Sequence, residues 1–424
     1  MKPREPSPID RAALTADYLR VRAASEAICA PLETEDYQVQ SILETSPPKW
    51  HLAHVSWFFE TFVLKPYAPG YRPFHPLFER IFNSYYESVG PFHPRADRHV
   101  LARPTVAEVY RYRHAVDAAM RELLATCPES DWSTAAARTT LGLHHEAQHQ
   151  ELLHMDIKAN FAACPLQPAY RERPEPERSG AAPAVRWIER PGGVAEMGYS
   201  GGGFAFDNEM PRHRMLLEAH RLASRLVTNG EYLEFIEAGG YRDPRWWLSD
   251  GWAAIKSRGW SAPLYWAQGD RGWSEMTLAG PHALDPALPV AHVSFYEADA
   301  YARFRGVRLP REAELEAVLD NLPVAGNFAE TGRLHPDRAR DDTDGQWYGD
   351  LWEWTQSPYT PYPGFRPAPG ALGEYNGKFM ANQLVLRGGA CVTPRWHMRP
   401  SYRNFFYPHD RWPFTGVRLA GDAA

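Results

Sequence analysis

The chain has 424 residues, more than one ordinary core needs, so its length predicts two domains. Apolar residues make up 44% of it, and 46 basic against 52 acidic residues leave a net charge of −6. This mild acidity excludes no enzyme class, but it gives no support to a nucleic-acid partner or an anionic membrane, which call for a basic stripe.

Targeting and redox signals are weak in this chain. No apolar run reaches the roughly 18 residues that a membrane span needs, and the polar start of the chain lacks the pattern of a secretory signal. The four cysteines are scattered and form no CxxC pair. We therefore expect no disulfide framework, no membrane partner and a reducing, cytoplasmic setting.

The first third of the chain has the apolar spacing of helices. They are predicted over residues 11–28, from Ser46 as a cap to Pro66, from a capping box at Thr105 and Glu108, and over residues 133–161. Four helices with a long connection over residues 65–104 predict a four-helix bundle that occupies residues 9–164.

The second part of the chain has a different pattern. Residues 165–184 are rich in Pro and charge and are predicted to be a linker. From residue 185 to 424, β-like pieces alternate with Gly/Pro turns and two short helices. The β-like pieces cover residues 185–188, 216–222, 384–387 and 414–419, and the helices cover residues 228–236 and 296–304. This pattern predicts an α+β domain with much irregular structure.

The strongest local motif lies in the fourth predicted helix. His145 and His149 are four residues apart, so both imidazoles project from one helix face. The second helix offers His51 and His54 among apolar residues, and a buried imidazole there needs a partner. Three neutral imidazoles suit Fe(II), Zn(II) or Cu(II) and leave coordination positions open.

Two other interpretations remain open from the residues alone. Residues 145–149 also match H-E-x-x-H, in which Glu146 would be the base of a zinc metallopeptidase. That interpretation needs a third ligand downstream, and His154 and Asp156 are the candidates within the next turns. A third interpretation is a binding protein whose His cluster is structural and which consumes no O2.

Motifs in both parts resemble a known family. Three N-terminal segments resemble the DinB-like iron domain of the ergothioneine-biosynthesis sulfoxide synthases (EgtB family, cysteine-using branch), namely residues 49–54 (KWHLAH), 82–86 (FNSYY) and 145–149 (HEAQH). The later part resembles the formylglycine-generating-enzyme family, whose fold is C-type-lectin-like, at residues 227–232 (VTNGEY), 289–294 (PVAHVS), 308–316 (RLPREAELE), 351–355 (LWEWT) and 386–391 (LRGGAC). Their order in one chain is highly specific.

The resemblance implies a role for each matching residue. The iron ligands would be His54, His145 and His149, with His51 structural or in an outer position. Gln148 would contact the substrate imidazole, and Tyr85 and Tyr86 would be the active-site tyrosines; in the other branch the catalytic tyrosine comes from the C-terminal domain. The betaine would be held by a C-terminal segment made of Arg403, Asn404, Phe405 and Phe406, where the γ-glutamylcysteine-using branch has Trp at the position of Phe405.

The implied reaction is O2-dependent and joins the sulfur of L-cysteine to the imidazole C2 of hercynine, giving hercynylcysteine sulfoxide. Aromatic faces suit a trimethylammonium group, and the aromatic-rich residues 402–412 offer them. Arg399 and Arg403 are close enough in sequence to hold the betaine carboxylate. For the carboxylate of the thiol substrate, the sequence leaves Arg80, Arg95, Arg98 and Arg103 open.

Related activities on the same scaffold are alternatives. A selenoneine synthase would use a selenium donor, and the motif at residues 82–86 disfavours this alternative only weakly. An ovothiol-type synthase usually carries a further methyltransferase domain, for which we expect no room after residue 419. Formylglycine generation needs a pair of reactive cysteines, whereas the second domain has Cys391 alone. The sulfur donor and the oligomeric state stay open.

Overall fold

The structure is a computed structural model that describes residues 9–172, 180–341 and 344–423. The chain divides into two compact units. The first comprises Met1–Pro165 with two later segments, Ser200–Phe206 and Pro367–Tyr375. The second comprises Leu166–Tyr199, Asp207–Arg366 and Asn376–Ala424. The middle of the predicted linker, residues 173–179, lies outside the described residues, and the predicted domain bounds stay a prediction.

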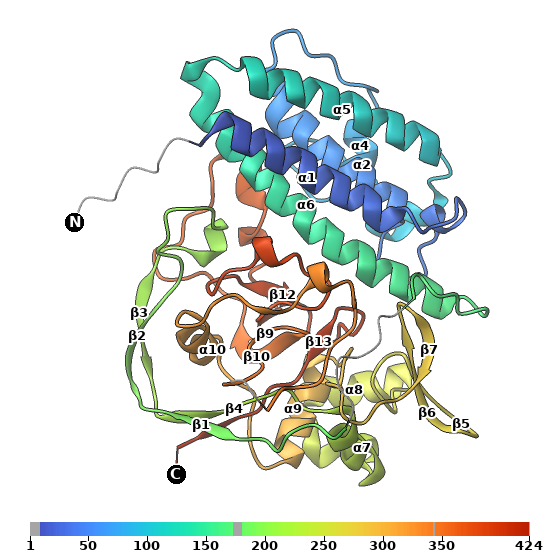
Figure 1. Ribbon diagram of the computed structural model, residues 1–424, viewed down its shortest axis with the longest axis vertical. Helices are drawn as coiled ribbons and strands as arrows, with labels where there is room; N and C mark the ends of the chain where they lie inside the picture. Colours follow the sequence, from blue (N-terminus) through green and yellow to red (C-terminus); the bar gives the residue numbers. More distant parts are fainter. Residues whose placement is uncertain (1–8, 173–179, 342–343, 424) are drawn as a thin grey trace. The chain divides into compact units, whose positions relative to one another are not determined.

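Four long helices build the first unit, as predicted (Figure 1). They are α1 (Arg11–Cys29), α2 (Pro48–Phe59), α5 (Val106–Thr126) and α6 (Glu129–Ala163). Helix α5 begins at the predicted capping box, in which Thr105 and Glu108 each accept from the other's backbone N–H. Gly142 lets α6 lie close to α2, because a Cβ there would fall 2.5 Å from the Phe59 ring.

The second helix differs from its prediction at both ends. Ser46 does not cap α2; its backbone N–H donates to Asp156 and its hydroxyl accepts from Arg98, so both groups serve tertiary contacts. The helix also continues past the expected stop, through a π-helical turn (Glu60–Leu64) into the short α3 (Lys65–Tyr67). The wider π turn offers a reason, because a Pro ring clashes with the carbonyl four residues earlier in a regular helix.

Among its described residues, the second unit contains five small sheets. The largest has the order β12-β11-β10-β13, and another has the order β1-β4-β14. The strands are β1 (Trp187–Arg190), β2 (Gly193–Met197), β3 (His213–Leu217), β4 (His220–Ala223), β5 (Trp266–Gly269), β6 (Gly272–Thr277), β7 (Gly280–Ala283), β8 (Gly326–Asn327), β9 (Tyr348–Gly349), β10 (Trp352–Pro358), β11 (Leu384–Arg387), β12 (Asn404–Phe406), β13 (Thr415–Gly416) and β14 (Ala420–Asp422). Predicted helices are found at α7 (Asn229–Glu237) and α9 (Phe295–Phe304).

Several predicted elements of this unit needed correction. The piece at residues 216–222 is two strands, β3 and β4, which belong to different sheets. Of the piece at residues 414–419, only β13 is a strand, and it pairs with β10; the next strand, β14, begins after this piece and pairs with β4. Two helices, α8 (Ser249–Arg258) and α10 (Glu312–Leu319), were not predicted. Strands this short carry too few residues for a clear alternation, so pairing partners decide where each one ends.

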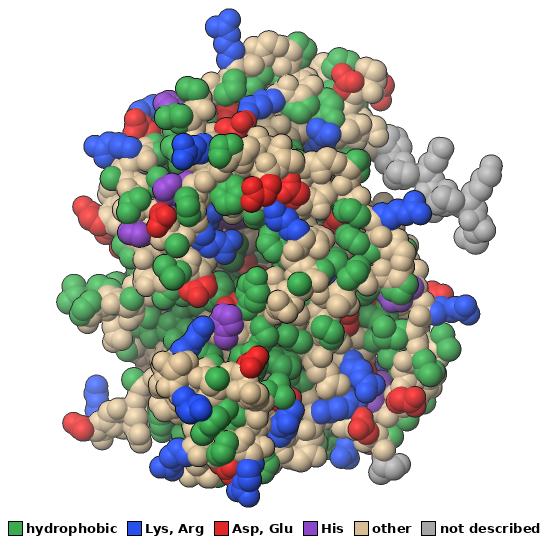
Figure 2. Space-filling model, turned by 180° about the vertical axis from the view of Figure 1, so that it is seen from behind, with side chains coloured by type: hydrophobic (Ala, Val, Ile, Leu, Met, Phe, Trp, Pro, Cys, Tyr) green, Lys and Arg blue, Asp and Glu red, His purple; other side chains and the backbone are tan. Residues whose placement is uncertain are grey.

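The surface agrees with the mild charge. On the face seen in Figure 2, acidic and basic side chains are interspersed among polar and apolar ones. No helix within the described ranges is both long and apolar enough to cross a membrane. None of the four cysteines forms a disulfide.

Candidate metal centre

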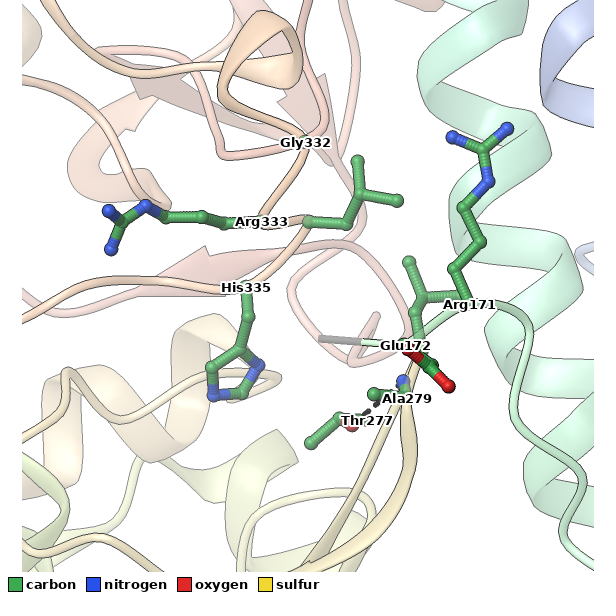
Figure 3. A pocket seen from close by; sticks show the side chains of 9 residues that line it. Arg171, Glu172, Thr277, Ala279, Gly332, Arg333 and His335 are labelled. Atoms are coloured by element: carbon green, nitrogen blue, oxygen red, sulfur yellow. Dashed lines mark hydrogen bonds between the residues drawn. The ribbon is translucent and has the colours of Figure 1, made fainter. Parts of the chain in front are cut away.

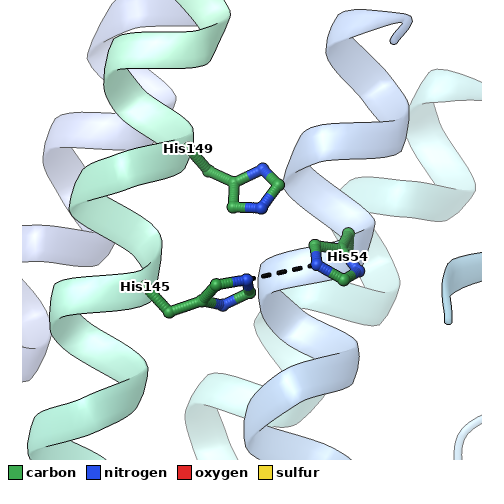
Figure 4. Close-up of side chains that lie close together, drawn as sticks. All are labelled: His54, His145 and His149. Atoms are coloured by element: carbon green, nitrogen blue, oxygen red, sulfur yellow. Dashed lines mark hydrogen bonds between the residues drawn. The ribbon is translucent and has the colours of Figure 1, made fainter. Parts of the chain in front are cut away.

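Three histidines meet inside the first unit. His54 on α2 faces His145 and His149, which are one turn apart on α6 (Figure 4). Each residue offers one ring nitrogen, and these nitrogens all lie within 4.8 Å of one another. The Nε2 atoms of His54 and His145 are 3.2 Å apart. The three residues that the sequence pattern and the resemblance singled out are therefore brought together, whereas His51 lies beside the cluster, between His149 and Asp156.

Aromatic packing holds these imidazoles in place. The ring of His54 lies between Trp50 and Trp57, with ring centroids 4.5 and 5.4 Å away and both pairs stacked. Phe58 packs on His145 with the ring centroids 4.6 Å apart. All of these aromatic residues belong to α2, whose residues are buried throughout. Locked rotamers of this kind reduce the freedom that a metal ligand would lose on binding.

Hydrogen bonds orient two of the three imidazole rings. His54 Nδ1 lies 2.5 Å from the carbonyl oxygen of Phe82, which can only accept. His54 therefore carries its proton on Nδ1 and turns the lone pair of Nε2 toward the cluster. His149 Nδ1 lies 2.8 Å from His51 Nδ1. His145 Nδ1 is buried and has no hydrogen-bond partner among the described residues.

Burial sets the charge state of the cluster. Desolvation lowers the pKa of His145 to about 3, and desolvation, then the neighbouring histidines, lowers the pKa of His54 and His149 well below the ordinary value. Neutral imidazoles are the form that binds metals. Two nitrogens that share one ion at about 2.1 Å lie about 3 Å apart, close to the 3.2 Å between the Nε2 atoms of His54 and His145. The residues fit a divalent metal bound by three histidines.

The two predicted tyrosines lie next to this cluster. Their rings stack on one another with centroids 4.6 Å apart, and the Tyr85 hydroxyl donates to the Tyr86 hydroxyl at 3.4 Å. Tyr86 packs on Trp57, which in turn stacks on His54. Burial, then the nearby Tyr85 and Tyr375, raises the pKa of Tyr86 well above its ordinary value. Tyr86 therefore keeps its proton at neutral pH.

A residue that the sequence analysis did not identify, Tyr375, completes this side of the site. Its hydroxyl donates to Gln148 Oε1, and its ring makes an edge contact with His145 at 5.6 Å between centroids. The adjacent Glu374 accepts from the backbone N–H groups of Glu87 and Ser88, directly after the paired tyrosines. Tyr375 lies in a loop without periodicity, so no local pattern marks it. The available signal was the resemblance, since the other branch of the family takes its catalytic tyrosine from the C-terminal domain.

Among the four arginines left open for the thiol carboxylate, Arg98 differs from the others by its burial. It is 1% exposed and its guanidinium lies 3.3 Å from the Trp50 ring centroid. It donates to the hydroxyls of Ser46 and Ser84, and no carboxylate among the described residues forms an ion pair with it. Burial, then the nearby Arg95, lowers its pKa well below the ordinary value, so an anion would be favoured there.

The residues predicted to hold the betaine all lie on the second unit. Asn404, Phe405 and Phe406 form β12 and are partly exposed, and Phe405 stacks on Tyr359 with centroids 4.0 Å apart. Arg403 is buried, and its guanidinium donates to both oxygens of Glu312 and to two backbone carbonyls. Four of the five N–H donors of Arg403 are thus already used by protein groups.

The peptidase interpretation needs a free carboxylate at Glu146, and the structure does not provide one. Glu146 is fully buried and accepts from Arg22 at 3.0 Å, Arg113 at 2.7 Å and Ser25 at 2.6 Å. These partners come from α1 and α5. A general base must reach the substrate's attacking water. Glu146 instead neutralises two buried arginines in the bundle.

A separate pocket lies on the second unit (Figure 3). Figure 3 shows His335 on one side and Arg171 on the other, with Thr277 and Ala279 between them. His335 Nε2 lies 3.4 Å from a carboxylate oxygen of Glu275. None of the predicted site residues lines this pocket.

Comparison with known proteins gives two matching families. Residues 17–153 match the DinB superfamily, and residues 172–331 and 345–423 match the sulfatase-modifying factor enzyme 1-like domain. The hercynine oxygenase of Mycolicibacterium thermoresistibile is 32% identical, with 89% of this chain and 87% of that protein covered. The hercynine oxygenase of Mycobacterium tuberculosis is also 32% identical, with 89% and 91% covered.

A more distant relative covers less of each chain. Ergothioneine biosynthesis protein 1 of Schizosaccharomyces pombe is 28% identical over 51% of this chain and 27% of that protein. Together with the two families, these matches confirm the predicted fold class, a DinB-like helical region followed by a formylglycine-generating-enzyme-like domain.

Proposed function

This chain belongs to the hercynine oxygenase family, and on that premise we propose that it is a non-haem Fe(II), O2-dependent sulfoxide synthase. It joins the sulfur of L-cysteine to the imidazole C2 of hercynine and gives hercynylcysteine sulfoxide, a step of ergothioneine biosynthesis. One observation carries the proposal, namely the three imidazole nitrogens of His54, His145 and His149 within 4.8 Å of one another.

The metal would be held by these three imidazoles, which leave further coordination positions open. Bound iron would supply the redox chemistry with O2 that amino-acid side chains lack. The balance is simple: hercynine, cysteine and O2 give the sulfoxide and one water. The C–H of the imidazole and the S–H of the thiol are lost, and one oxygen atom stays on sulfur.

The tyrosines and Gln148 act on protons and orientation. Tyr375 donates to Gln148 Oε1 and so orients this side chain, which we propose contacts the substrate imidazole. Tyr86 keeps its proton because burial raises its pKa, and Tyr85 donates to its oxygen. A positioned O–H of this kind can give a proton or hydrogen atom while the C–S bond forms.

We predict that the tyrosines contribute unequally. Tyr85→Phe removes the hydroxyl at the partly exposed end of the pair, and Tyr86→Phe removes the buried one. We expect one of these two variants, the one that lacks the proton-donating hydroxyl, to lower kcat about 100-fold or more, in line with general acid catalysis. The KM for hercynine should stay nearly unchanged. Steady-state O2 uptake measures both constants. A kcat within threefold of the parent in both variants and in Tyr375→Phe would remove tyrosines from the mechanism.

Arg98 is proposed to bind the carboxylate of the thiol substrate. It is a buried cation stacked on Trp50, which itself stacks on His54. We expect Arg98→Met to raise the KM for cysteine about 10-fold or more, because a charge-assisted hydrogen bond is worth about 1.5–3 kcal/mol. The KM for hercynine should stay the same. Arg103→Met serves as the control, because Arg103 is exposed. An equal effect of both substitutions contradicts this assignment.

For the betaine, we propose the aromatic surface around Phe405 and Phe406. Both side chains are partly exposed on β12, and a quaternary ammonium group is attracted to such ring faces. Arg403 was predicted to hold the carboxylate and remains a candidate, although Glu312 already neutralises it. Phe405→Leu should therefore weaken hercynine binding more than Arg403→Gln alters it, as isothermal titration with hercynine alone would measure.

The decisive experiment is O2 uptake by protein loaded anaerobically with Fe(II). Hercynine is supplied with L-cysteine, with γ-glutamylcysteine or with a selenium donor, and the masses of the products are measured by mass spectrometry. We expect uptake to need both hercynine and L-cysteine, and a product mass equal to their sum plus one oxygen less two hydrogens. Uptake with another donor alone would assign the chain to that activity. No uptake with any pair, together with peptide cleavage by zinc-loaded protein, would overturn the proposal.

A further inference from the structure

A chain of three polar groups runs away from the metal centre. Asp156 and His149 lie on α6, and His51 lies on α2 between them. His51 Nε2 is 2.9 Å from Asp156 Oδ2, and His51 Nδ1 is 2.8 Å from His149 Nδ1. The side chains of His51 and Asp156 are only 2% and 3% exposed. Neither His51 nor Asp156 belongs to the three-histidine cluster itself.

The chemistry of these contacts fixes where the protons lie. An ionised carboxylate only accepts, so His51 must donate from Nε2 to Asp156. A neutral His51 then has a lone pair on Nδ1, and that atom accepts from His149 Nδ1–H. The proton of His149 is thereby kept on Nδ1, and its Nε2 presents a lone pair. In the opposite tautomer His149 would present an N–H, which cannot bind a metal.

Two features show that this arrangement is built into the bundle. Asp156 Oδ2 also accepts from the backbone N–H of Ser46 at 2.8 Å, and that residue lies just before α2. The His51 ring makes edge contacts with both Trp50 and His149, with centroids 5.9 and 5.1 Å apart. The same contacts therefore join α2 to α6 and aim the His149 ring.

We propose that Asp156 and His51 form a relay that positions His149 as a metal ligand, with Asp156 acting through His51. The relay selects the His149 tautomer and makes its Nε2 a stronger donor. The three ligands then differ: a backbone carbonyl orients His54, the relay orients His149, and His145 Nδ1 has no partner among the described residues. This inference rests on the proposed metal centre, and it predicts which residues outside that centre control metal affinity.

The test measures metal binding without any turnover. The dissociation constant for Co(II) is determined by competition with a chromophoric chelator, and the d–d absorption of bound Co(II) reports ligand geometry. The variants are His51→Phe, Asp156→Asn and the double variant. Loss of a partner of this kind typically costs about 10–100-fold in metal affinity, which we expect for His51→Phe. A smaller loss in the same direction is expected for Asp156→Asn, which keeps an acceptor but removes the charge.

The double variant separates a relay from two independent structural effects. If Asp156 acts through His51, the double variant binds Co(II) no more weakly than His51→Phe does. Independent effects would instead add. Glu60→Gln is the matched control: Glu60 is a buried carboxylate that accepts from Tyr71, Tyr112 and the backbone of Phe74. It should lower the melting temperature and leave the Co(II) affinity unchanged.

Failure of the relay and failure of the metal centre give different results. Parent protein that binds Co(II), with variants that bind it equally well or with additive losses, overturns the relay alone. Parent protein that binds no Co(II) overturns the metal centre, whatever the variants do. Should His51→Phe not fold, Asp156→Asn still decides, because an affinity and an absorption spectrum identical to those of the parent contradict the relay.

Discussion

Replacing His145 with alanine should abolish both metal binding and O2 uptake. His145 supplies one of three nitrogens that lie within 4.8 Å of one another, and two imidazoles rarely retain a divalent ion against competition. We expect metal affinity to fall by more than about 100-fold, beyond the effect of removing an outer partner. The substitution breaks no hydrogen bond at His145 Nδ1, because this atom has no hydrogen-bond partner among the described residues.

The measurements are iron per chain after anaerobic loading and O2 uptake with hercynine and L-cysteine. His144→Ala is the matched control, because it is the preceding residue on α6 and its ring stacks on Phe204 instead of joining the cluster. It should retain one iron per chain. A His145→Ala protein that keeps its iron and its turnover would show that the metal, if any, is bound elsewhere.

The second large effect concerns stability. Glu146→Gln should lower the free energy of unfolding by about 3–5 kcal/mol, the typical cost of breaking a buried ion pair from one side. The fully buried carboxylate of Glu146 lies between Arg22 and Arg113, and the amide cannot neutralise them. Urea denaturation measures the difference. Asp17→Asn, which affects an exposed ion pair with Arg20, should change the free energy by less than about 1 kcal/mol.

The carboxylate of Glu146 should also make the stability of the protein depend on pH. Burial alone would raise the pKa of Glu146, but Arg113 and Arg22 outweigh it and hold the pKa below the ordinary value. A group with a lowered folded pKa stabilises the protein above its unfolded pKa of about 4.3 and loses that contribution as the pH falls. The stability of the parent should therefore decline below about pH 4, and Glu146→Gln should show less of this decline.

These results also bear on the competing function. A peptidase base at Glu146 would lose activity on conversion to Gln without a large change in stability. For Glu146 in the bundle we expect the opposite, a large loss of stability with O2 uptake retained, because this residue contacts arginines of α1 and α5. Folded Glu146→Gln protein that still consumes O2 would agree with the proposed function, whereas undiminished stability would contradict the network.

Local patterns in the sequence determined much of the first unit. The capping box at Thr105 and the apolar spacing of α1 are properties of neighbouring residues, so both elements appear where they were predicted. The separation of His145 and His149 by one helical turn follows from the 3.6-residue period alone. The short strands of the second unit were less predictable, because pairing between distant segments decides their bounds.

Only the tertiary structure decided which distant side chains contact one another at the site. The residues left His51 and His54 equally possible as ligands; packing of α2 on α6 turns His54 toward His145 and His51 toward Asp156. Packing likewise withdrew Glu146 from any catalytic position and brought Tyr375 to Gln148, 227 residues away in sequence. Helical periodicity fixes which side chains share a face, but contacts between segments depend on the burial and hydrogen bonding of the whole fold, which no local pattern contains.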